Sequence, residues 1–139
     1  MKILFDTNII LDVLQKRDPF YIHSSAVLRM VETKQVKGFI TANSVTDIYY
    51  ILNRTIKDKK AVYSALIILL QVVDIIDVTS ADVKSALRHD VIDFEDELIS
   101  VCASRAKINY IISRNTEDFV DSLVNTITPE QFLELSFKN

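Results

Sequence analysis

Apolar residues follow two patterns along this chain: short continuous runs, and longer stretches with helical spacing. The first run ends at Phe5 and leads without a turn residue into Asp6, Thr7 and Asn8. A short run that is apolar throughout is typical of a strand buried on both faces of a sheet. Such runs predict strands at 3–5, 39–41, 72–78 and 110–113, with a short edge strand at 126–127.

The stretches between these runs have the spacing of helices. Asp18 before Pro19 is a candidate helix start, and Ser44 is a candidate N-cap. Gly38, the one glycine of the chain, is expected at a turn with unusual backbone angles. The apolar spacing predicts helices at 9–14, 20–33, 45–56, 61–70, 79–88, 93–107 and 129–133, with the helices on either side of the basic segment 57–60 forming a hairpin.

Strands that alternate with helices predict an α/β fold. We expect a three-layer sandwich in which a central parallel sheet of four or five strands is flanked by helices. The length of 139 residues suits a single domain, 1–139. Right-handed crossovers then bring the carboxyl ends of all strands to one edge of the sheet, where ligands bind in such folds.

Composition narrows the setting of the protein. Hydrophobic residues make up 49% and charged residues 25%, as in folded globular proteins. Cys102 has no partner within the chain, which favours the reducing cytoplasm. Asp6 interrupts the first apolar run, so no secretory signal is expected, and the apolar segment 65–76 is too short to span a membrane. The net charge of −3 argues against a general basic coat for nucleic acids.

Four aspartates lie where the predicted sheet would gather functional groups: Asp6, Asp47, Asp96 and Asp118. Asp6 follows the first strand directly, and Asp118 follows the fourth strand. Asp47 and Asp96 lie near the starts of predicted helices. If the sheet is parallel, all four carboxylates converge at its carboxyl edge.

Helix capping is the alternative explanation for three of these acids. The pairs Ser44 with Asp47, Asp93 with Asp96, and Asn115 with Asp118 have the spacing of a capping box. A capping box prefers the longer Glu or Gln at its fourth position, which weakens this explanation for the set. Asp93 and Asp96 compete for the third place in the acidic group, and we favour Asp96 because Asp93 is placed to cap the helix that carries it.

Gathered carboxylates imply a cation, because they would otherwise raise one another's pKa. Ligands that are oxygen atoms alone select Mg²⁺ or Mn²⁺ rather than zinc. Such an ion activates water for attack on a phosphodiester and stabilises the charge on the leaving oxygen. The sequence therefore favours a hydrolase with a hard divalent cation.

Four ordered motifs resemble those of PIN domains. They are Asp6-Thr7-Asn8, the segment from Ser44 to Leu52, Asp93-Phe94-Glu95-Asp96, and the segment from Ser113 to Phe119. The resemblance covers nearly the whole chain and is greatest to small single-domain PIN proteins, many of them VapC-type toxins of toxin–antitoxin pairs.

This resemblance implies a metal-dependent endoribonuclease that an antitoxin protein neutralises, and a homodimer in the cytoplasm. It places Asp6, Asp47, Asp96 and Asp118 in the family's acidic cluster, with Asp6, Asp96 and Asp118 as metal ligands, Asn8 and Asn115 as supports, and Arg114 as a substrate contact. The second acid of the family is often Glu, so Asp47 is shorter by a methylene and is expected to act through water.

Two other functions have support in the sequence. Asp47 and the acidic net charge are compatible with a catalytically silent PIN-like module that binds RNA or a protein. Phosphatases that form a phospho-aspartate also use an acid after the first strand, but Asn8 stands where such enzymes place a second acid. His89 is expected at the surface, and Cys102 in the core. The RNA target is not predicted, since RNA readout depends on shape and stacking.

Overall fold

A five-stranded parallel sheet forms the centre of the molecule. The computed structural model describes residues 1–88, 93–119 and 122–137. The strand order is β3-β2-β1-β4-β5, and every neighbouring pair is parallel, as predicted. Its strands are β1 (Lys2–Phe5), β2 (Lys37–Thr41), β3 (Asp74–Ile76), β4 (Tyr110–Ile112) and β5 (Thr126–Ile127).

Helices connect the strands in the predicted order. Strand β3 is shorter than the predicted strand 72–78: the preceding helix includes Val72, and the strand ends at Ile76. Within the described ranges, no helix has the length and apolar character needed to cross a membrane. The helices are α1 (Thr7–Leu14), α2 (Tyr21–Glu32), α3 (Ala42–Ile56), α4 (Lys59–Val72), α5 (Ser80–Leu87), α6 (Phe94–Arg105), the 3₁₀ helix η1 (Thr116–Phe119) and α7 (Pro129–Phe137).

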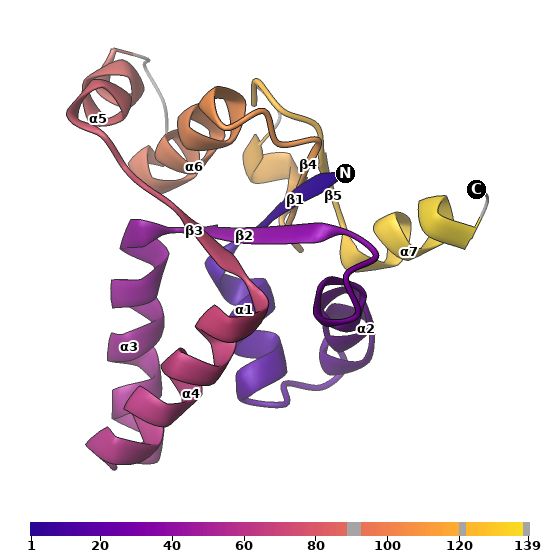
Figure 1. The fold of residues 1–139 in the computed structure, drawn as a ribbon. Helices are drawn as coiled ribbons and strands as arrows, with labels where there is room; N and C mark the ends of the chain where they lie inside the picture. Colours follow the sequence, from indigo (N-terminus) through magenta and orange to yellow (C-terminus); the bar gives the residue numbers. More distant parts are fainter. Residues whose placement is uncertain (89–92, 120–121, 138–139) are drawn as a thin grey trace.

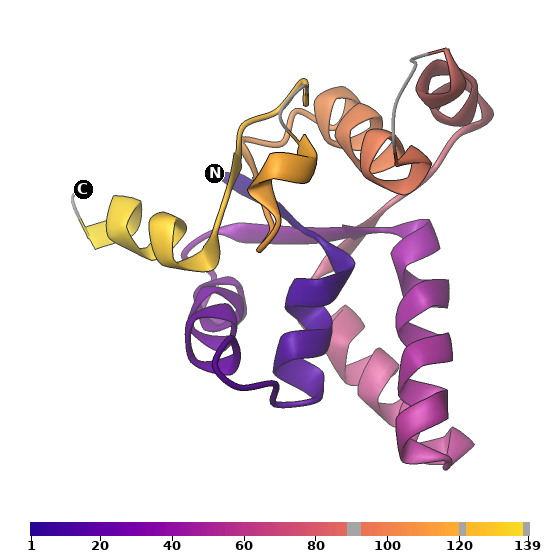
Figure 2. The ribbon, with the colours of Figure 1, turned by 180° about the vertical axis from the view of Figure 1, so that it is seen from behind.

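The sheet separates two hydrophobic cores, which confirms the three-layer α/β sandwich. In β1, Ile3 and Phe5 belong to the core that α1, α2, α3 and α4 cover, whereas Leu4 belongs to the core under α5 and α6. This alternation follows from the pleat of a strand, which points successive side chains to opposite faces. Figures 1 and 2 show α5 and α6 on one side of the sheet and α1 to α4 on the other.

Gly38 lies inside strand β2 rather than at a turn, so the sequence prediction for it was wrong. Its φ is not positive. A Cβ atom at this position would come within 2.8 Å of both Val31 methyl groups and 3.0 Å of the Phe5 ring. Glycine is therefore needed here for the close approach of α2 to the sheet. The residues with left-handed backbone, in the described part of the chain, are the lysines Lys16, Lys34, Lys57 and Lys107.

Two predicted helix starts were also wrong. Asp18 does not cap α2: the N-cap is Phe20, and the helix begins at Tyr21. Residues 18–20 form a turn before the helix, closed by a hydrogen bond from the Tyr21 N–H to the carbonyl of Arg17. Helix α3 begins at Ala42, so Ser44 lies inside its first turn. The Ser44 hydroxyl is buried and bonds to those of Thr41 at 2.9 Å and Thr7 at 3.1 Å.

Other local predictions are confirmed. A helix, α5, lies within the predicted range 79–88, and Thr79 caps it in a full capping box with Asp82. Helices α3 and α4 form the expected hairpin, with the Tyr49 ring 5.9 Å from that of Tyr63. Cys102 is fully buried, and burial raises the pKa of its thiol to about 12. The prediction for His89 concerns a residue outside the described ranges.

Candidate active site

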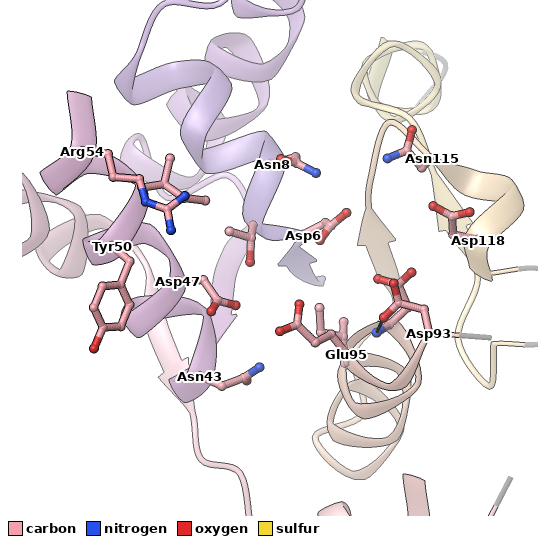
Figure 3. Close-up of a pocket in the computed structure, with 14 residues that line it drawn as sticks. Asp6, Asn8, Asn43, Asp47, Tyr50, Arg54, Asp93, Glu95, Asn115 and Asp118 are labelled. Carbon is pink, nitrogen blue, oxygen red and sulfur yellow. Dashed lines mark hydrogen bonds between the residues drawn. The ribbon is translucent and has the colours of Figure 1, made fainter. Parts of the chain in front are cut away.

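A pocket of about 580 Å³ opens where strands β1 and β4 end. All four predicted acids line it, together with two further carboxylates, those of Asp93 and Glu95. Figure 3 shows the groups from α3 on one side of the pocket, the groups from α6 and the segment after β4 on the other, and Asp6 between them. The lining residues are Asp6, Thr7, Asn8, Asn43, Asp47, Tyr50, Ile51, Arg54, Asp93, Glu95, Asp96, Ile99, Asn115 and Asp118.

Asp6 is the most buried acid of the pocket, with 8% of its surface exposed. It follows the last residue of β1 and precedes α1, yet its side chain forms no cap hydrogen bond with that helix. The Ser113 hydroxyl, at the end of β4, donates to Asp6 Oδ2 at 2.9 Å. Burial raises the pKa of Asp6, and the Ser113 hydrogen bond opposes this shift. The neighbouring strand thus holds the carboxylate in place.

Asp93 and Asp96 have separate roles at the start of α6. Asp93 is the N-cap residue, and its Oδ1 accepts a hydrogen bond from the Asp96 N–H at 3.2 Å. In the described part of the chain, the Asp96 side chain accepts no such cap hydrogen bond, and burial in the pocket raises its pKa to about 7, with further contributions from Asp93, Asp6, Asp118 and Glu95. Both residues line the pocket, and the structure shows that Asp93 caps the helix as expected; the choice of Asp96 as the third acid of the group stays a prediction.

Asp47 lies in the middle of α3, so helix capping does not explain it. Burial raises its pKa. Across the pocket, the negative charge of Asp47 is the largest of the factors that raise the pKa of Glu95, followed by burial. Sequence reasoning treated Glu95 as part of a motif without assigning it a role. Its proximity to Asp47 is the signal that only the fold supplies.

The remaining predicted residues divide into two groups. Asp118, Asn8 and Asn115 line the pocket as expected. Arg114 does not: its Nε donates to Asp12 Oδ2 at 2.8 Å, and its guanidinium lies 3.9 Å from the centre of the Phe20 ring. Asp12 is fully buried, so this pair holds the segment after β4 against α1.

Besides Ile51, helix α3 contributes three pocket residues that were not in the predicted site, the polar or charged Asn43, Tyr50 and Arg54. Together with Asp47 they are separated by four, three and four residues, the spacing of one helical face. This spacing can be read from the sequence. The sequence does not show, however, that this face of the helix lines the pocket.

The donor set fits a hard divalent cation by its chemistry. Its ligands are oxygen atoms of carboxylates and amides, which Mg²⁺ and Mn²⁺ prefer. In the described ranges, no group of three or more His, Cys, Asp or Glu side chains is placed so that the group could hold a metal ion. Mg²⁺ keeps several waters and uses only one or two carboxylates, so an open pocket of this kind meets its needs.

Known structures share the fold of this chain. VapBC2 from Rickettsia felis, bound to a DNA fragment from its promoter, matches with a TM-score of 0.68 and 19% identity over 92% of this chain and 98% of that one. A toxin–antitoxin complex from Klebsiella pneumoniae matches with 0.65 and 23% over 91% and 96%. VapC20 from Mycobacterium tuberculosis, a toxin that cleaves the sarcin-ricin loop, matches with 0.62 and 20% over 78% and 86%.

The sequence itself decides the family. No curated protein matches the chain, but the sequence profile of the PIN domain matches residues 2–117. This range includes Asp6, Asp47 and Asp96 and ends one residue before Asp118. Because the match extends over most of the chain and agrees with the fold, the chain belongs to the PIN domain family.

Proposed function

We propose that this protein is a Mg²⁺- or Mn²⁺-dependent endoribonuclease that acts at the acidic pocket, as the toxin of a toxin–antitoxin pair. One observation carries the proposal: six carboxylates line the pocket, and in the described part of the chain Arg54 is the one cation among its lining residues. Such a group is unfavourable unless a cation binds: burial, and after it the neighbouring carboxylates, raise the pKa of Asp96 to about 7.

We assign the metal ion to Asp6, Asp96 and Asp118, which come from three segments that line the pocket; one or two of them would bind it directly and the rest through its water molecules. When bound, the ion would lower the pKa of a water molecule and stabilise negative charge on the phosphodiester. The ribonuclease then needs no nucleophile from the protein.

The surrounding residues orient these carboxylates. Ser113 donates to Asp6, and the Asn115 N–H donates to the same Ser113 hydroxyl at 3.1 Å, which links the two strand ends. Asp93 fixes the first turn of α6 and so positions Asp96. The amides of Asn8 and Asn115 line the pocket, where they would bond to carboxylates or water. Preorganised ligands of this kind reduce the reorganisation that metal binding requires.

Asp47 and Glu95 would act in the outer part of the site. Asp47 is shorter than the Glu that often occupies its place in PIN domains, so we assign it a role through water. Glu95 brings a longer carboxylate to the same region, as its electrostatic coupling to Asp47 shows. This second acid supports an active site over a catalytically silent module.

The toxin assignment rests on likeness of fold. Similar structures include VapBC2 and a toxin–antitoxin complex. We propose an antitoxin protein partner, a homodimer and a cytoplasmic location. Induced expression should arrest growth, and co-expression of a small protein from the neighbouring reading frame should restore it. The mass of the purified chain in solution tests the homodimer.

Cleavage of RNA tests the enzyme directly. The purified protein should cleave RNA with Mg²⁺ or Mn²⁺ and not with a chelator. D6N and D96N should each lose at least about a hundredfold in rate, as expected for ligands of a catalytic ion. D74N is the matched control, because Asp74 is an exposed acid at the opposite end of the sheet. Cleavage retained by D6N and D96N would contradict the mechanism, and RNA binding without cleavage would favour the silent module.

A further inference from the structure

We infer that the face of α3 formed by Asn43, Asp47, Tyr50 and Arg54 is the track along which an unpaired RNA strand enters the pocket, with a base stacked on Tyr50 and a phosphate bound by Arg54. This inference rests on the proposed nuclease function and deepens it. The face borders the acids along its length, and Figure 3 shows the four side chains in a column on one side of the pocket.

Tyr50 has the properties of a stacking platform. Its side chain is 58% exposed although it lines the pocket. The Tyr49 ring supports it from within the hairpin, edge to face, at 5.6 Å between ring centres. Because the Tyr50 ring is exposed, it contributes little to the packing of the hydrophobic core, although the Tyr49 ring holds it in place. Stacking on an unpaired base would cover it, and bases of every sequence offer a flat face for this contact.

Arg54 has the properties of a phosphate ligand. It is exposed at the pocket rim, and within the described ranges no carboxylate forms an ion pair with it, despite six in the same pocket. Arg54 lies seven residues beyond Asp47, about 10 Å along the helix axis. The acids surround the scissile phosphate, so Arg54 would bind a phosphate farther along the strand. Arginine is well suited to this contact because its donors match phosphate oxygens.

Asn43 completes the track at the first turn of α3. Its Oδ1 atom is buried and has no hydrogen-bond partner in the part of the chain that the structure describes. Because this oxygen is buried, a strand in the pocket would meet the amide nitrogen of Asn43, which Figure 3 shows at the end of the side chain. Its N–H group would donate to a phosphate oxygen, a base carbonyl or a ribose 2′-hydroxyl oxygen, and the last contact would favour RNA over DNA.

An unpaired strand fits this face better than a duplex. In an A-form duplex the bases are stacked on one another and are not free to lie on a side chain. Tyr50 is therefore usable only where a base is splayed out. The order of groups along the helix also matches a single backbone: carboxylates at the reacting phosphate, then an aromatic ring, then a cation.

Binding should be measured in the D6N background, so that the probe is not cleaved, with a fluorescently labelled unstructured RNA and its fully paired duplex. Y50L should weaken binding of the unpaired RNA about tenfold, whereas Y50F keeps the ring and should bind normally. Tyr63 is the matched control: it is 59% exposed, lies near the same Tyr49, and is absent from the pocket lining. Y63L should leave binding unchanged.

Arg54 is tested by salt dependence. R54Q should weaken binding about fivefold and reduce the slope of log affinity against log salt by roughly 0.7, as expected for one lost phosphate contact on a single strand. R29Q, at an exposed arginine of α2 outside the pocket, changes the net charge equally and should keep the slope. If R54Q weakened binding only by disturbing the structure, the affinity would fall without this specific change in the salt slope.

The outcomes separate this inference from the proposed function. If the wild-type protein cleaves RNA but Y50L and Y63L bind it equally, the α3 track is wrong and the nuclease stands. Equal binding of the paired and unpaired probes would also overturn the track. If the wild-type protein neither binds nor cleaves RNA, both the track and the proposed function fail.

Discussion

Asp82 and Asp96 occupy the same position relative to the start of a helix and differ in almost every other respect. Each lies three residues beyond an N-cap, Thr79 for α5 and Asp93 for α6. In both helices the N-cap side chain accepts a hydrogen bond from the backbone N–H of the aspartate, at 3.1 and 3.2 Å. The two carboxylates then meet opposite surroundings.

Donors surround Asp82. The Thr79 N–H donates to its Oδ2 at 2.9 Å, and Arg105 Nε donates to its Oδ1 at 3.0 Å. Burial raises the pKa of this carboxyl, but the hydrogen bonds from Arg105 and Thr79 outweigh burial and lower the pKa to about 2. The nearly buried Asp82 carboxylate therefore stabilises the fold: it belongs to the capping box of α5 and forms an ion pair with Arg105.

Acids surround Asp96. Burial and the charges of Asp93, Asp6, Asp118 and Glu95 raise its pKa to about 7. The comparison shows that the spacing from the N-cap decides where a helix begins, whereas the partners from distant segments decide what the carboxylate does. A compensated acid stabilises the fold, and an uncompensated one is available to a cation.

Among the variants that test this difference between Asp82 and Asp96, R105M should have the largest effect on stability. It leaves the Asp82 carboxylate, whose side chain is 4% exposed, without its cation. Loss of one partner of a buried pair is strongly destabilising, and because Arg105 itself is partly exposed we expect a loss of about 3 kcal/mol in the free energy of unfolding. Urea denaturation measures this. R88M, at an exposed arginine that ends α5, should change stability little; an equal loss in both variants would contradict the role of the pair.

D82N should destabilise the protein by about 2 kcal/mol near neutral pH, because the folded state lowers the pKa of this group from 3.8 to about 2. A lowered pKa adds stability above the unfolded value of 3.8, and this stability is lost as the pH falls through about 2. The difference between wild type and D82N should therefore shrink in acid. A difference that is constant down to pH 2 would indicate a packing effect instead.

D96N should have the opposite sign. A raised pKa makes the charged form of Asp96 unfavourable, and this penalty grows from pH 3.8 until it is complete above about 7. Without divalent cations and above that pH, D96N should stabilise the protein by about 1–2 kcal/mol, discounted because the side chain is partly exposed. The gain should be absent in acid. Destabilisation by D96N at all pH values would mean that its carboxylate is compensated.

Mg²⁺ should produce the smallest shift, a stabilisation of about 1 kcal/mol at a concentration about five times its dissociation constant. Thermal unfolding with and without Mg²⁺ measures it. The shift should disappear in D6N and D96N and persist in D82N, whose acid is already paired. If only D82N lost the shift, the ion would bind near Asp82 and not in the acidic pocket, which would contradict the account.

Local patterns predicted the fold because each element carries its own signal. The run Ile3 to Phe5 indicated a strand buried on both faces, and the order of strands and helices implied the parallel sheet. Predictions failed where the choice of residue depends on a contact with a segment that is distant in the sequence. Gly38 is required by Val31 and Phe5 across the packing of α2 on the sheet, and no local rule reveals this contact.

The candidate site was predicted in the same uneven way. Asp6, Asp47, Asp96 and Asp118 follow from strand ends and motif spacing, and all four line the pocket. The preference of a capping box for Glu or Gln does not hold at α5, where Asp82 completes one. Arg114 looked like a substrate contact because it adjoins Asn115. Its true partner, Asp12, is 102 residues away in sequence, so sequence proximity could not identify it.

The central claim is that the pocket's uncompensated acids form a cation site, and the titration of the Asp96 carboxyl tests it most directly. Carbon NMR of the side chain should give a pKa of about 7 without divalent cations and a value at least about one unit lower with saturating Mg²⁺, because a bound cation favours the charged form. D6N should abolish the Mg²⁺ effect. A pKa near 3.8 without metal, or one that Mg²⁺ leaves unchanged, would contradict the account.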